Sequence, residues 1–381
     1  WSTSKYDGWQ FIASPIVNAN VIDFIPMTDT DYDLFKYDGT KELQWINYKG
    51  HFNEFEKTFQ LGTAYLASYE AETSTSFSGL LNNASSFDFD VTYYGEDSWA
   101  NFHLLGNPFP FNMDWNKVTL ENVYDGYAIV NPSDGSYMTY TKSENEGIIA
   151  AGEGFFVEAI GEAPSFSYST SSKTRGENDT DNINVIATGK QGRNNVIIKF
   201  AGAEEAGFSK LANINPNIAE VYVKNKGKRY GILSYDENIT EVELFFEAKE
   251  MGSYSIKLDV NGEFETVTLV DRFTGIETNM LLEDEYTFTA SGNDNANRFV
   301  IKLDNGQQTT TNSQFVYQSG EELILSIEGS VQIVDMLGRV VYSNEHANGD
   351  NRINVAEFND ATYVVRVVNE EGVKVQKVVI Y

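Results

Sequence analysis

The chain of 381 residues contains no cysteine, so no disulfide cross-links it and no thiolate takes part in its chemistry. Histidine is also scarce: His51, His103 and His346 are scattered along the chain, which disfavours histidine-based catalysis and histidine-ligated metals. The 27 basic residues are outnumbered by 56 acidic ones, for a net charge of −29. Because such a field repels phosphate, we expect no nucleic-acid partner and no binding to an anionic membrane surface.

Long apolar runs are missing too. No stretch approaches the ~20 consecutive apolar residues of a membrane-spanning helix, so the sequence predicts no transmembrane segment. The hydrophobic content of 41% and aromatic content of 14% are typical of a folded protein rather than an acidic disordered tail. The sequence begins at Trp1 rather than Met and lacks a secretory leader, so we expect its N-terminus to have been trimmed or cut from a longer chain.

Composition divides the chain into three blocks. Residues 1–172 hold all five tryptophans and no arginine, with seven Lys against 24 Asp plus Glu, which gives 7 − 24 = −17 of the net charge. Two polar segments without apolar periodicity, 169–182 and 304–313, have the composition of linkers. The predicted domains are therefore 1–172, 183–303 and 314–381.

Within the blocks, apolar residues alternate with polar ones. Runs such as 87–93, 196–200, 254–260 and 264–270 are rich in β-branched and aromatic residues and are bounded by Gly, Asn and Asp. The predicted fold class is all-β, built from tandem antiparallel β-sandwiches. The dipeptide Asn261-Gly262 between two such runs predicts a two-residue hairpin.

The first block shows signs of an internal repeat. Trp9 to Pro15 aligns with Phe102 to Pro108, each an apolar strand that ends in a small residue and a proline. Two further cues follow in the same order: 32–39 with 127–135, and 61–71 with 151–159. Offsets of roughly 90–96 predict two copies of one β-module, at about 1–95 and 96–172. The alternative is chance similarity between strand-rich segments.

The second copy carries a recognisable motif. Leu105-Gly-Asn-Pro-Phe-Pro-Phe-Asn-Met-Asp-Trp115 precedes the strand Gly152-Glu-Gly-Phe-Phe-Val157. Gly and Asn permit a tight turn, Pro fixes φ, and Trp115 is placed to pack the turn down, so we predict a structural role, with direct ligand contact as the alternative. The pair of motifs resembles a module of large secreted and surface proteins of Bacteroidetes-type bacteria.

The C-terminal block reads as a small β-sandwich of roughly 70 residues. Residues 331–343 form a strand, a Leu-Gly-Arg turn and a second strand, and residues 361–381 form a hairpin around Asn369-Glu-Glu-Gly372. Lys374 and Lys377 interrupt the last, otherwise sticky strand, which restrains edge-to-edge aggregation. An ordinary terminal sandwich with no further role is the alternative reading of these patterns.

Three elements in order, 331–341, 362–367 and 377–379, make residues 314–381 resemble the type A C-terminal sorting domain of type IX secretion cargo. The resemblance implies an immunoglobulin-like domain, export across the outer membrane, and a secreted or cell-surface location. Its partners would be the secretion translocon and sorting machinery. It assigns the export signal to Gly338, Arg339, Tyr363, Lys374 and Lys377. One departure is Ala361, which stands where the family usually has glycine.

The middle block resembles the β-domain that often precedes such sorting domains, through residues 267–275, 286–290 and 298–303. Its apolar alternation favours core packing rather than a site. Arg298 is predicted to pair across strands with either Asp271 or Glu285, and the sequence leaves this choice open.

Catalytic motifs are not found: the chain has no G-x-S-x-G, no H-E-x-x-H and no P-loop. We therefore expect no enzyme activity, although a carboxylate pair in a cleft of the first block would indicate a hydrolase. Asp29, Asp31 and Asp33 have the first spacings of a calcium loop, but Leu34 and Thr40 stand where that loop needs Gly and Glu. Calcium held in another loop geometry is one interpretation and a solvated acidic turn is the other.

Aromatic residues are dense in the first block, and exposed aromatics favour interfaces because they bury a large area at low entropic cost. Trp45, Tyr94, Trp99 and Tyr137 are the candidate ligand-binding residues. The alternative is that they fill the cores of the repeat. We thus predict a secreted or surface-displayed, non-enzymatic adhesion protein that binds a glycan or a host protein. The alternative is an accessory carbohydrate- or protein-binding region at the C-terminus of a larger secreted hydrolase.

Overall fold

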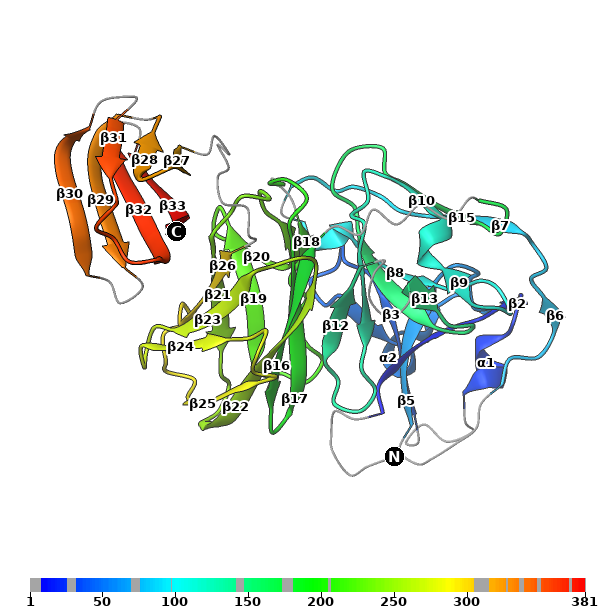
Figure 1. The fold of residues 1–381 in the computed structure, drawn as a ribbon. Helices are drawn as coiled ribbons and strands as arrows, with labels where there is room; N and C mark the ends of the chain where they lie inside the picture. Colours follow the sequence, from blue (N-terminus) through cyan, green and yellow to red (C-terminus); the bar gives the residue numbers. More distant parts are fainter. Residues whose placement is uncertain are drawn as a thin grey trace. The chain divides into compact units, whose positions relative to one another are not determined.

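The computed structural model describes residues 8–25, 32–69, 76–96, 98–141, 147–172, 181–204, 207–304, 315–326, 328–335, 339–347, 351–369 and 372–380. The chain divides into two compact units, Trp1–Gly306 and Gln307–Tyr381. Most described elements are strands, and the sheets are built from antiparallel pairs except for one parallel pair, β17 with β20 (Figure 1). The predicted all-β class is confirmed.

Two four-stranded sheets form the framework of the first block, and their strand orders match. The first sheet has the order β1 (Gln10–Ala13), β5 (Ala64–Tyr69), β3 (Tyr32–Tyr37), β4 (Trp45–Asn47). The second has the order β8 (Phe102–Gly106), β14 (Gly154–Glu158), β11 (Tyr127–Val130), β12 (Tyr137–Tyr140). Each strand of the first sheet thus has a counterpart at the same place in the second.

The contacts between these two sheets also match. The backbone N–H of Ala13 donates to the carbonyl of Gly152 at 2.8 Å, and that of Gly106 donates to the carbonyl of Gly62 at 2.9 Å. Ala13 and Gly106 are 93 positions apart and Gly62 and Gly152 are 90 apart, which are offsets of the predicted repeat. The duplication itself stays a prediction, and these paired contacts support it.

Small residues let the two sheets approach closely, at a contact that we call the glycine junction (Gly106 and Gly154 against Ala13 and Ala64). A Cβ atom on Gly106 would lie 2.4 Å from the Cβ of Ala13, and one on Gly154 would lie 2.3 Å from the Cβ of Ala64. No carbon atoms tolerate such distances without movement of the backbone. Glycine is therefore required at both positions because of packing, not because of an unusual φ.

Smaller elements complete the first block. The short pairs are β2 (Ile16–Val17) with β6 (Leu80–Leu81) and β9 (Met113–Asp114) with β13 (Ile148–Ile149). A three-stranded sheet joins β10 (Val118–Glu121), β15 (Ser165–Ser169) and β7 (Ser86–Phe89). Single turns of helix are α1 (Val21–Phe24), α2 (Tyr48–His51), η1 (Phe52–Glu54), η2 (Trp99–Asn101) and η3 (Trp115–Lys117).

The structural role predicted for the Gly-Asn-Pro motif is confirmed. Asn107 is fully buried, and its amide nitrogen lies within hydrogen-bonding distance of the carbonyls of Phe111, Ile149 and Ala150, at 2.9–3.1 Å. Its amide oxygen accepts from the N–H of Phe109 at 2.9 Å. The indole of Trp115 is also fully buried. Asn107 thus satisfies buried backbone groups of the turn and of residues 149–150, and the Trp115 indole packs beneath and donates to Asp125 at 2.8 Å.

The middle block is an eleven-stranded sheet that folds over its own core. Along the sheet the order is β24 (Ile276–Asn279), β23 (Thr266–Asp271), β26 (Phe299–Asp304), β21 (Glu241–Glu247), β19 (Glu220–Asn225), β20 (Lys228–Ser234), β17 (Gly192–Lys199), β16 (Asn182–Gly189), β22 (Gly252–Asn261), β25 (Tyr286–Ala290), with β18 (Phe208–Ser209) on β20. Phe288 near one end packs on Phe299 near the other, with ring centroids 4.9 Å apart. The sheet thus closes a sandwich-like core.

The hairpin predicted at Asn261-Gly262 is wrong. Asn261 ends β22 opposite Asn182 of β16, whereas the following strand β23 pairs with β24 and β26. The dipeptide therefore carries the chain from one part of the sheet to another. Gly262 has φ +130°, and a Cβ there would lie 2.5 Å from the Cγ of Asp181. This close contact, rather than a hairpin turn, is the reason that the position requires glycine.

Arg298 pairs with Asp271, one of its two predicted partners. Its Nε and Nη2 donate to the two carboxylate oxygens of Asp271 at 2.9 and 2.7 Å, and both side chains are almost fully buried. This bidentate pair lowers the pKa of Asp271 against the opposing effect of burial. The guanidinium of Arg298 also lies 4.6 Å from the centre of the Phe288 ring, so the ion pair is part of the packed core.

The first two blocks share one hydrophobic core within the first unit. Phe102 of β8 packs edge-on against Phe208 of β18, with ring centroids 5.5 Å apart. A second contact, which we call the amide junction, joins β12 and the turn before it to Asn194, Asn195, Asn213 and Asn215. The predicted linker at 169–182 therefore connects two blocks that are packed against each other.

The second unit is a small sandwich of two sheets. One has the order β27 (Val316–Ser319), β28 (Glu322–Leu325), β31 (Asn351–Asn354), and the other β30 (Val340–Ala347), β29 (Gly329–Asp335), β32 (Ala361–Asn369), β33 (Gly372–Ile380). Alternating residues such as Val331, Ile333 and Val365 are fully buried between the sheets. The strands predicted on either side of the Leu-Gly-Arg turn and of Asn369-Gly372 are present and paired.

Candidate functional site

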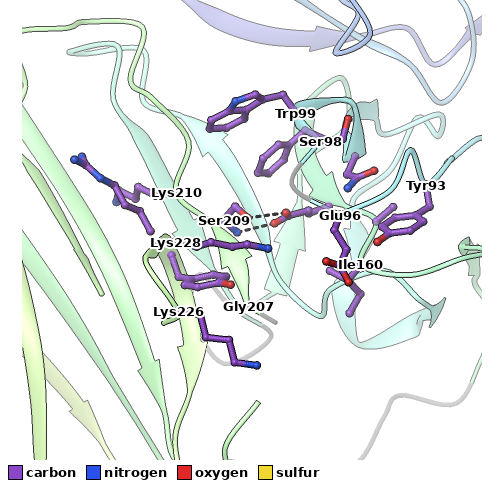
Figure 2. Close-up of a pocket in the computed structure, with 16 residues that line it drawn as sticks. Tyr93, Glu96, Ser98, Trp99, Ile160, Gly207, Ser209, Lys210, Lys226 and Lys228 are labelled. Carbon is purple, nitrogen blue, oxygen red and sulfur yellow. Dashed lines mark hydrogen bonds between the residues drawn. The ribbon is translucent and has the colours of Figure 1, made fainter. Parts of the chain in front are cut away.

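A pocket of about 490 Å³ opens in the first unit, where the second four-stranded sheet meets the eleven-stranded sheet. Its volume lies within the range of small-molecule sites, about 300–1,000 Å³. In Figure 2, Trp99, Ser98, Glu96, Tyr93 and Ile160 lie on one side, and Lys210, Ser209, Lys228, Lys226 and Gly207 on the other. The remaining lining residues are Asn101, Phe102, Glu158, Ala159, Arg229 and Tyr230.

Trp99 is the exposed aromatic residue of the first wall. Its indole is 50% exposed and stacks on Phe102, with ring centroids 5.9 Å apart and planes 23° from parallel. The backbone around it is fixed as well, because Ser98 accepts from the N–H of Ala100 and the hydroxyl of Tyr37 donates to the carbonyl of Trp99. The ring is therefore held in place before any ligand arrives.

Asn101 shapes the adjoining loop. Its amide oxygen accepts from the N–H of Tyr94 at 2.7 Å, and its amide nitrogen donates to the carbonyl of Gly95 at 2.8 Å. Asn101 is itself 4% exposed, so these partly buried hydrogen bonds tie the loop to the core. They hold Tyr93 and Glu96 at the rim of the pocket.

A basic hairpin forms the opposite wall. Strands β19 and β20 are joined by Lys226-Gly227, whose φ angles of +49° and +85° are those of a type I′ turn. Within Lys224-Asn-Lys-Gly-Lys-Arg229, four of the six residues are basic and none is acidic. Lys226 and Lys228 are exposed and line the pocket. This is a local concentration of positive charge on an acidic chain.

The guanidinium of Arg229 is held by side chains of the neighbouring strands β19 and β21. Its guanidinium pairs with Glu247 at 2.7 Å and Glu220 at 3.4 Å, and lies 4.4 Å from the centre of the Tyr222 ring. These contacts raise the pKa of Arg229 against the opposing effect of burial. They anchor the base of the hairpin, so the position of Lys228 next along the strand is defined.

Glu158 is the buried carboxyl group at the floor. Its two oxygens accept from the N–H and the hydroxyl of Ser209, at 2.6 and 2.7 Å. Burial raises the pKa of Glu158 from 4.5 to about 7, against the opposing effects of the two Ser209 hydrogen bonds and of the charge on Lys228. The carboxyl group is therefore partly neutral at pH 7, which weakens negative charge at the floor.

Lys210 lies deeper still. Its ammonium group donates to the carbonyl of Asn195 at 2.5 Å, and burial lowers its pKa from 10.5 to about 7, against the raising effect of Glu220. The stem of Lys210 lines the pocket while its ammonium is engaged in the amide junction. The Lys210 amine therefore serves the fold, because the carbonyl of Asn195 occupies it.

The four candidate ligand residues fall into two groups. Trp99 and Tyr94 are about half exposed, at 50% and 51%, and Trp99 lines the pocket. Tyr137 is only 4% exposed, and its ring stacks on Phe11 with centroids 6.0 Å apart. Trp45 is half-buried and stacks on the same ring of Phe11 at 6.4 Å. Tyr137 and Trp45 thus fill the core between the two sheets.

The calcium prediction falls largely outside the described residues, because Asp29 and Asp31 lie there. Asp33 is in β3, where its carboxylate accepts from Asn47 at 2.9 Å and pairs with Lys49 at 3.1 Å. Within the described part of the chain, no group of three or more His, Asp or Glu side chains is arranged to hold a metal ion.

Four of the five residues of the predicted export signal lie in or beside one sheet of the second unit, and the fifth, Gly338, lies outside the described residues. Arg339 directly precedes β30, is exposed and pairs with Asp335 at 2.6 Å. Tyr363 is buried in β32, and its hydroxyl donates to the carbonyl of Asn359. Lys377 is exposed on the edge strand β33, and the side chain of Lys374 on the same strand is outside the described part.

Ala361, the departure from the family pattern, begins β32 and lies opposite Ile380 of β33. Its backbone is extended, a conformation that any residue adopts, so the position does not call for glycine. The substitution is compatible with the sheet as it stands.

Sequence reasoning missed the basic hairpin and Glu158. The signal for the hairpin was present, since four basic residues in six positions are conspicuous in this acidic chain, and Lys-Gly between two strands is typical of a turn. Glu158 gave no such signal. It ends an apolar strand and became notable only through its burial against Ser209, which is 51 residues away.

By its fold, the second unit is a small β-sandwich of two sheets, with candidate signal residues at the start of β30 and on the edge strand β33. Residues 309–381 match the family model described as "Secretion system C-terminal sorting domain". The C-terminal unit is thus a type IX secretion sorting domain, and the protein is exported to the cell surface or the medium. No curated protein and no solved structure was found to match the chain. None of the helices that the structure describes has the length and apolar character needed to cross a membrane.

Proposed function

We propose that the first unit is a non-enzymatic binding module and that the protein acts in adhesion outside the cell. The single observation that carries this proposal is the pocket beside Trp99, with an exposed indole held on a rigid wall. An aromatic ring buries a large area when a ligand covers it, and a ring already fixed in place loses little entropy on binding. The sorting domain carries this pocket to the outside, where glycans and host proteins are found.

A second candidate is an accessory binding region of a larger secreted hydrolase, in which the same pocket holds the substrate chain near a separate catalytic domain. The two candidates share the pocket and differ only in what the precursor encodes. Reading the coding region upstream of Trp1 separates them: a catalytic domain there supports the accessory role, and its absence supports adhesion.

We also propose a duplication in the first block, an immunoglobulin-like sorting domain and a bacterial source. The first block consists of two copies of one β-module, which the matching strand orders support. The sorting domain is immunoglobulin-like, in keeping with its two packed sheets. The source is a bacterium of the Bacteroidetes type, in keeping with the export route that the sorting domain implies.

The binding role is tested by screening the purified chain against immobilised glycans and matrix proteins. Trp99→Ala is expected to abolish or strongly reduce the binding that the wild type shows. Phe273→Ala is the matched control, because Phe273 is 79% exposed but does not line the pocket. Equal binding by wild type and Trp99→Ala contradicts the proposed site, and binding to no member of the screen contradicts the function.

A further inference from the structure

The lining of the pocket is polar for a small-molecule site. Nine of its 16 lining residues are Ser, Asn, Glu, Lys or Arg, whereas such sites are mostly lined by apolar and aromatic side chains. The most exposed aromatic ring of the lining is the indole of Trp99, which stacks on the buried ring of Phe102. A ligand that matches this lining has one flat apolar face and hydrogen-bonding groups around the rest of its surface.

Arg229, the strongest base of the pocket, is compensated within the protein. Its guanidinium pairs with Glu220 and Glu247, at 3.4 and 2.7 Å. The ammonium of Lys249 pairs with the same two carboxylates, at 3.6 and 3.5 Å. Two positive and two negative charges thus form one neutral group, and an anionic ligand would have to separate a pair before it could bind there.

The lysines beside Arg229 are engaged as well. Lys226 and Lys228 each interact with other groups of the chain, and the charge on Lys228 acts on the buried carboxyl group of Glu158. Each of the four basic side chains that the structure describes at the pocket therefore has a partner within the chain. An anionic ligand competes with these partners, which removes most of the gain from its charge.

A cationic ligand is disfavoured for a different reason. Glu96 is exposed on the wall that carries Trp99, and Lys226 and Lys228 stand on the opposite wall (Figure 2). A cation drawn to Glu96 meets ammonium groups across the pocket, just as an anion drawn to the lysines meets the Glu96 carboxylate. An uncharged ligand avoids both penalties, and hydroxyl groups on it find a carboxylate acceptor in Glu96.

We propose that the pocket binds a neutral oligosaccharide, with the apolar face of one pyranose ring on the indole of Trp99 and hydroxyl groups directed to the polar rim at Glu96. The inference rests on the proposed binding function and names its ligand class. A pyranose ring presents C–H groups on a face and hydroxyls around its edge, which are the two surfaces that the lining matches. A peptide anchor instead requires a fully desolvated pocket, which this polar lining does not provide.

The test is a titration of the whole chain with saccharides that share one backbone and linkage and differ in charge. These are a neutral cello-oligosaccharide, an anionic glucuronan oligosaccharide and a cationic chitosan oligosaccharide, and neutral galacto- and manno-oligosaccharides complete the set. We expect at least one neutral oligosaccharide to bind, with an affinity that salt changes little because the ligand has no charge to screen. The two charged oligosaccharides should bind about tenfold more weakly than the best neutral one, because one wall repels each of them.

Variants of Trp99 test the stacked ring. Trp99→Phe keeps a flat ring and is expected to retain part of the affinity for the neutral oligosaccharide. Trp99→Leu is apolar but not flat, and is expected to weaken binding about tenfold or more. Phe273→Leu is the matched control, because Phe273 is 79% exposed and does not line the pocket. Equal affinities of Trp99→Leu and Trp99→Phe, or an equal loss in Phe273→Leu, overturn the stacked arrangement.

The remaining outcomes separate this inference from the function beneath it. If a charged oligosaccharide binds more tightly than every neutral one and depends on Trp99, the binding function stands and the neutral ligand class is wrong. If no saccharide binds but a matrix protein does, with the same dependence on Trp99, the site holds a protein ligand and the saccharide class is wrong. If no saccharide and no matrix protein binds, both the inference and the proposed function fail.

Discussion

The second four-stranded sheet has two junctions of opposite chemistry. At the glycine junction it meets the first sheet through Gly106 and Gly154, which lie too close to Ala13 and Ala64 for any side chain. At the amide junction it meets the eleven-stranded sheet through buried side-chain amides, and beside these contacts lies the pocket. The first junction is defined by direct packing of small residues, whereas the second is defined by side-chain hydrogen bonds.

We expect the largest loss in the free energy of unfolding from a substitution at the glycine junction. Gly154→Val places a branched side chain where even Cβ lies 2.3 Å from the Cβ of Ala64, so the sheets have to separate. We expect a loss of about 3 kcal/mol or more in the free energy of unfolding, measured by urea denaturation. Gly50→Ala is the control, since nothing lies within 4 Å of a Cβ there, and a similar loss in that variant contradicts the packing argument.

The contact between Glu158 of β14 and Ser209 of β18, at the floor of the pocket beside the amide junction, is distinguished by its response to pH. Because the pKa of Glu158 is raised from 4.5 to about 7, the folded chain keeps a proton that the unfolded chain releases between these pH values. Its contribution to stability is therefore lost as pH rises from about 4.5 to 7, by up to about 3 kcal/mol. Glu158→Gln removes this slope in denaturation curves taken across the range. Glu96→Gln, at an exposed carboxylate of the same pocket, is expected to keep the slope, and an unchanged slope in Glu158→Gln refutes the assignment.

Asn195 tests the hydrogen bonds of the amide junction directly. Its amide oxygen accepts from the N–H of Thr139 at 2.8 Å and its amide nitrogen donates to the carbonyl of Thr139 at 2.8 Å, all within the core. Asn195→Ala leaves both backbone groups buried without this partner, so we expect a loss of about 2 kcal/mol on denaturation. Asn293→Ala, at an exposed position, is expected to change the free energy of unfolding by less than about 0.5 kcal/mol. A loss there as large as that of Asn195→Ala would contradict the stabilising role of the buried hydrogen bonds.

The smallest expected change in stability is at the pocket wall. Trp99 is 50% exposed, so Trp99→Ala should alter the free energy of unfolding by about 1 kcal/mol or less, while its effect on binding is large. Thermal denaturation alongside the binding assay checks this separation. A loss of stability as great as that of Gly154→Val would show that the ring serves the fold rather than a ligand.

The sequence predicted the parts of the molecule that depend on local pattern. Alternation revealed the β class, and the Leu-Gly-Arg turn and last strands revealed the sorting domain, because those signals lie within short segments. What depends on tertiary contact was not predictable. Asn261-Gly262 has the pattern of a hairpin, yet its strand pairs with β16 and β25. Tyr137 and Trp99 are both aromatic residues at strand or turn starts, and only packing buries one and exposes the other.

The pocket was predictable only in part, for the same reason. Trp99 and Tyr94 stood out by residue type, whereas Ser209 and Glu158 are 51 residues apart and meet only because the two blocks pack together. The hairpin at Lys226 was visible as a charge run, but its position opposite Trp99 follows from the tertiary fold.

The most direct test of the proposed binding site is amide hydrogen exchange along the whole chain, with and without a saturating concentration of a ligand found in the screen of glycans and matrix proteins. We expect added protection confined to the two walls of the pocket, residues 93–96, 98–102 and 224–230, with the floor at 158–160. Protection that leaves these segments unchanged and falls instead on the sorting domain or on β7, β10 and β15 would contradict it.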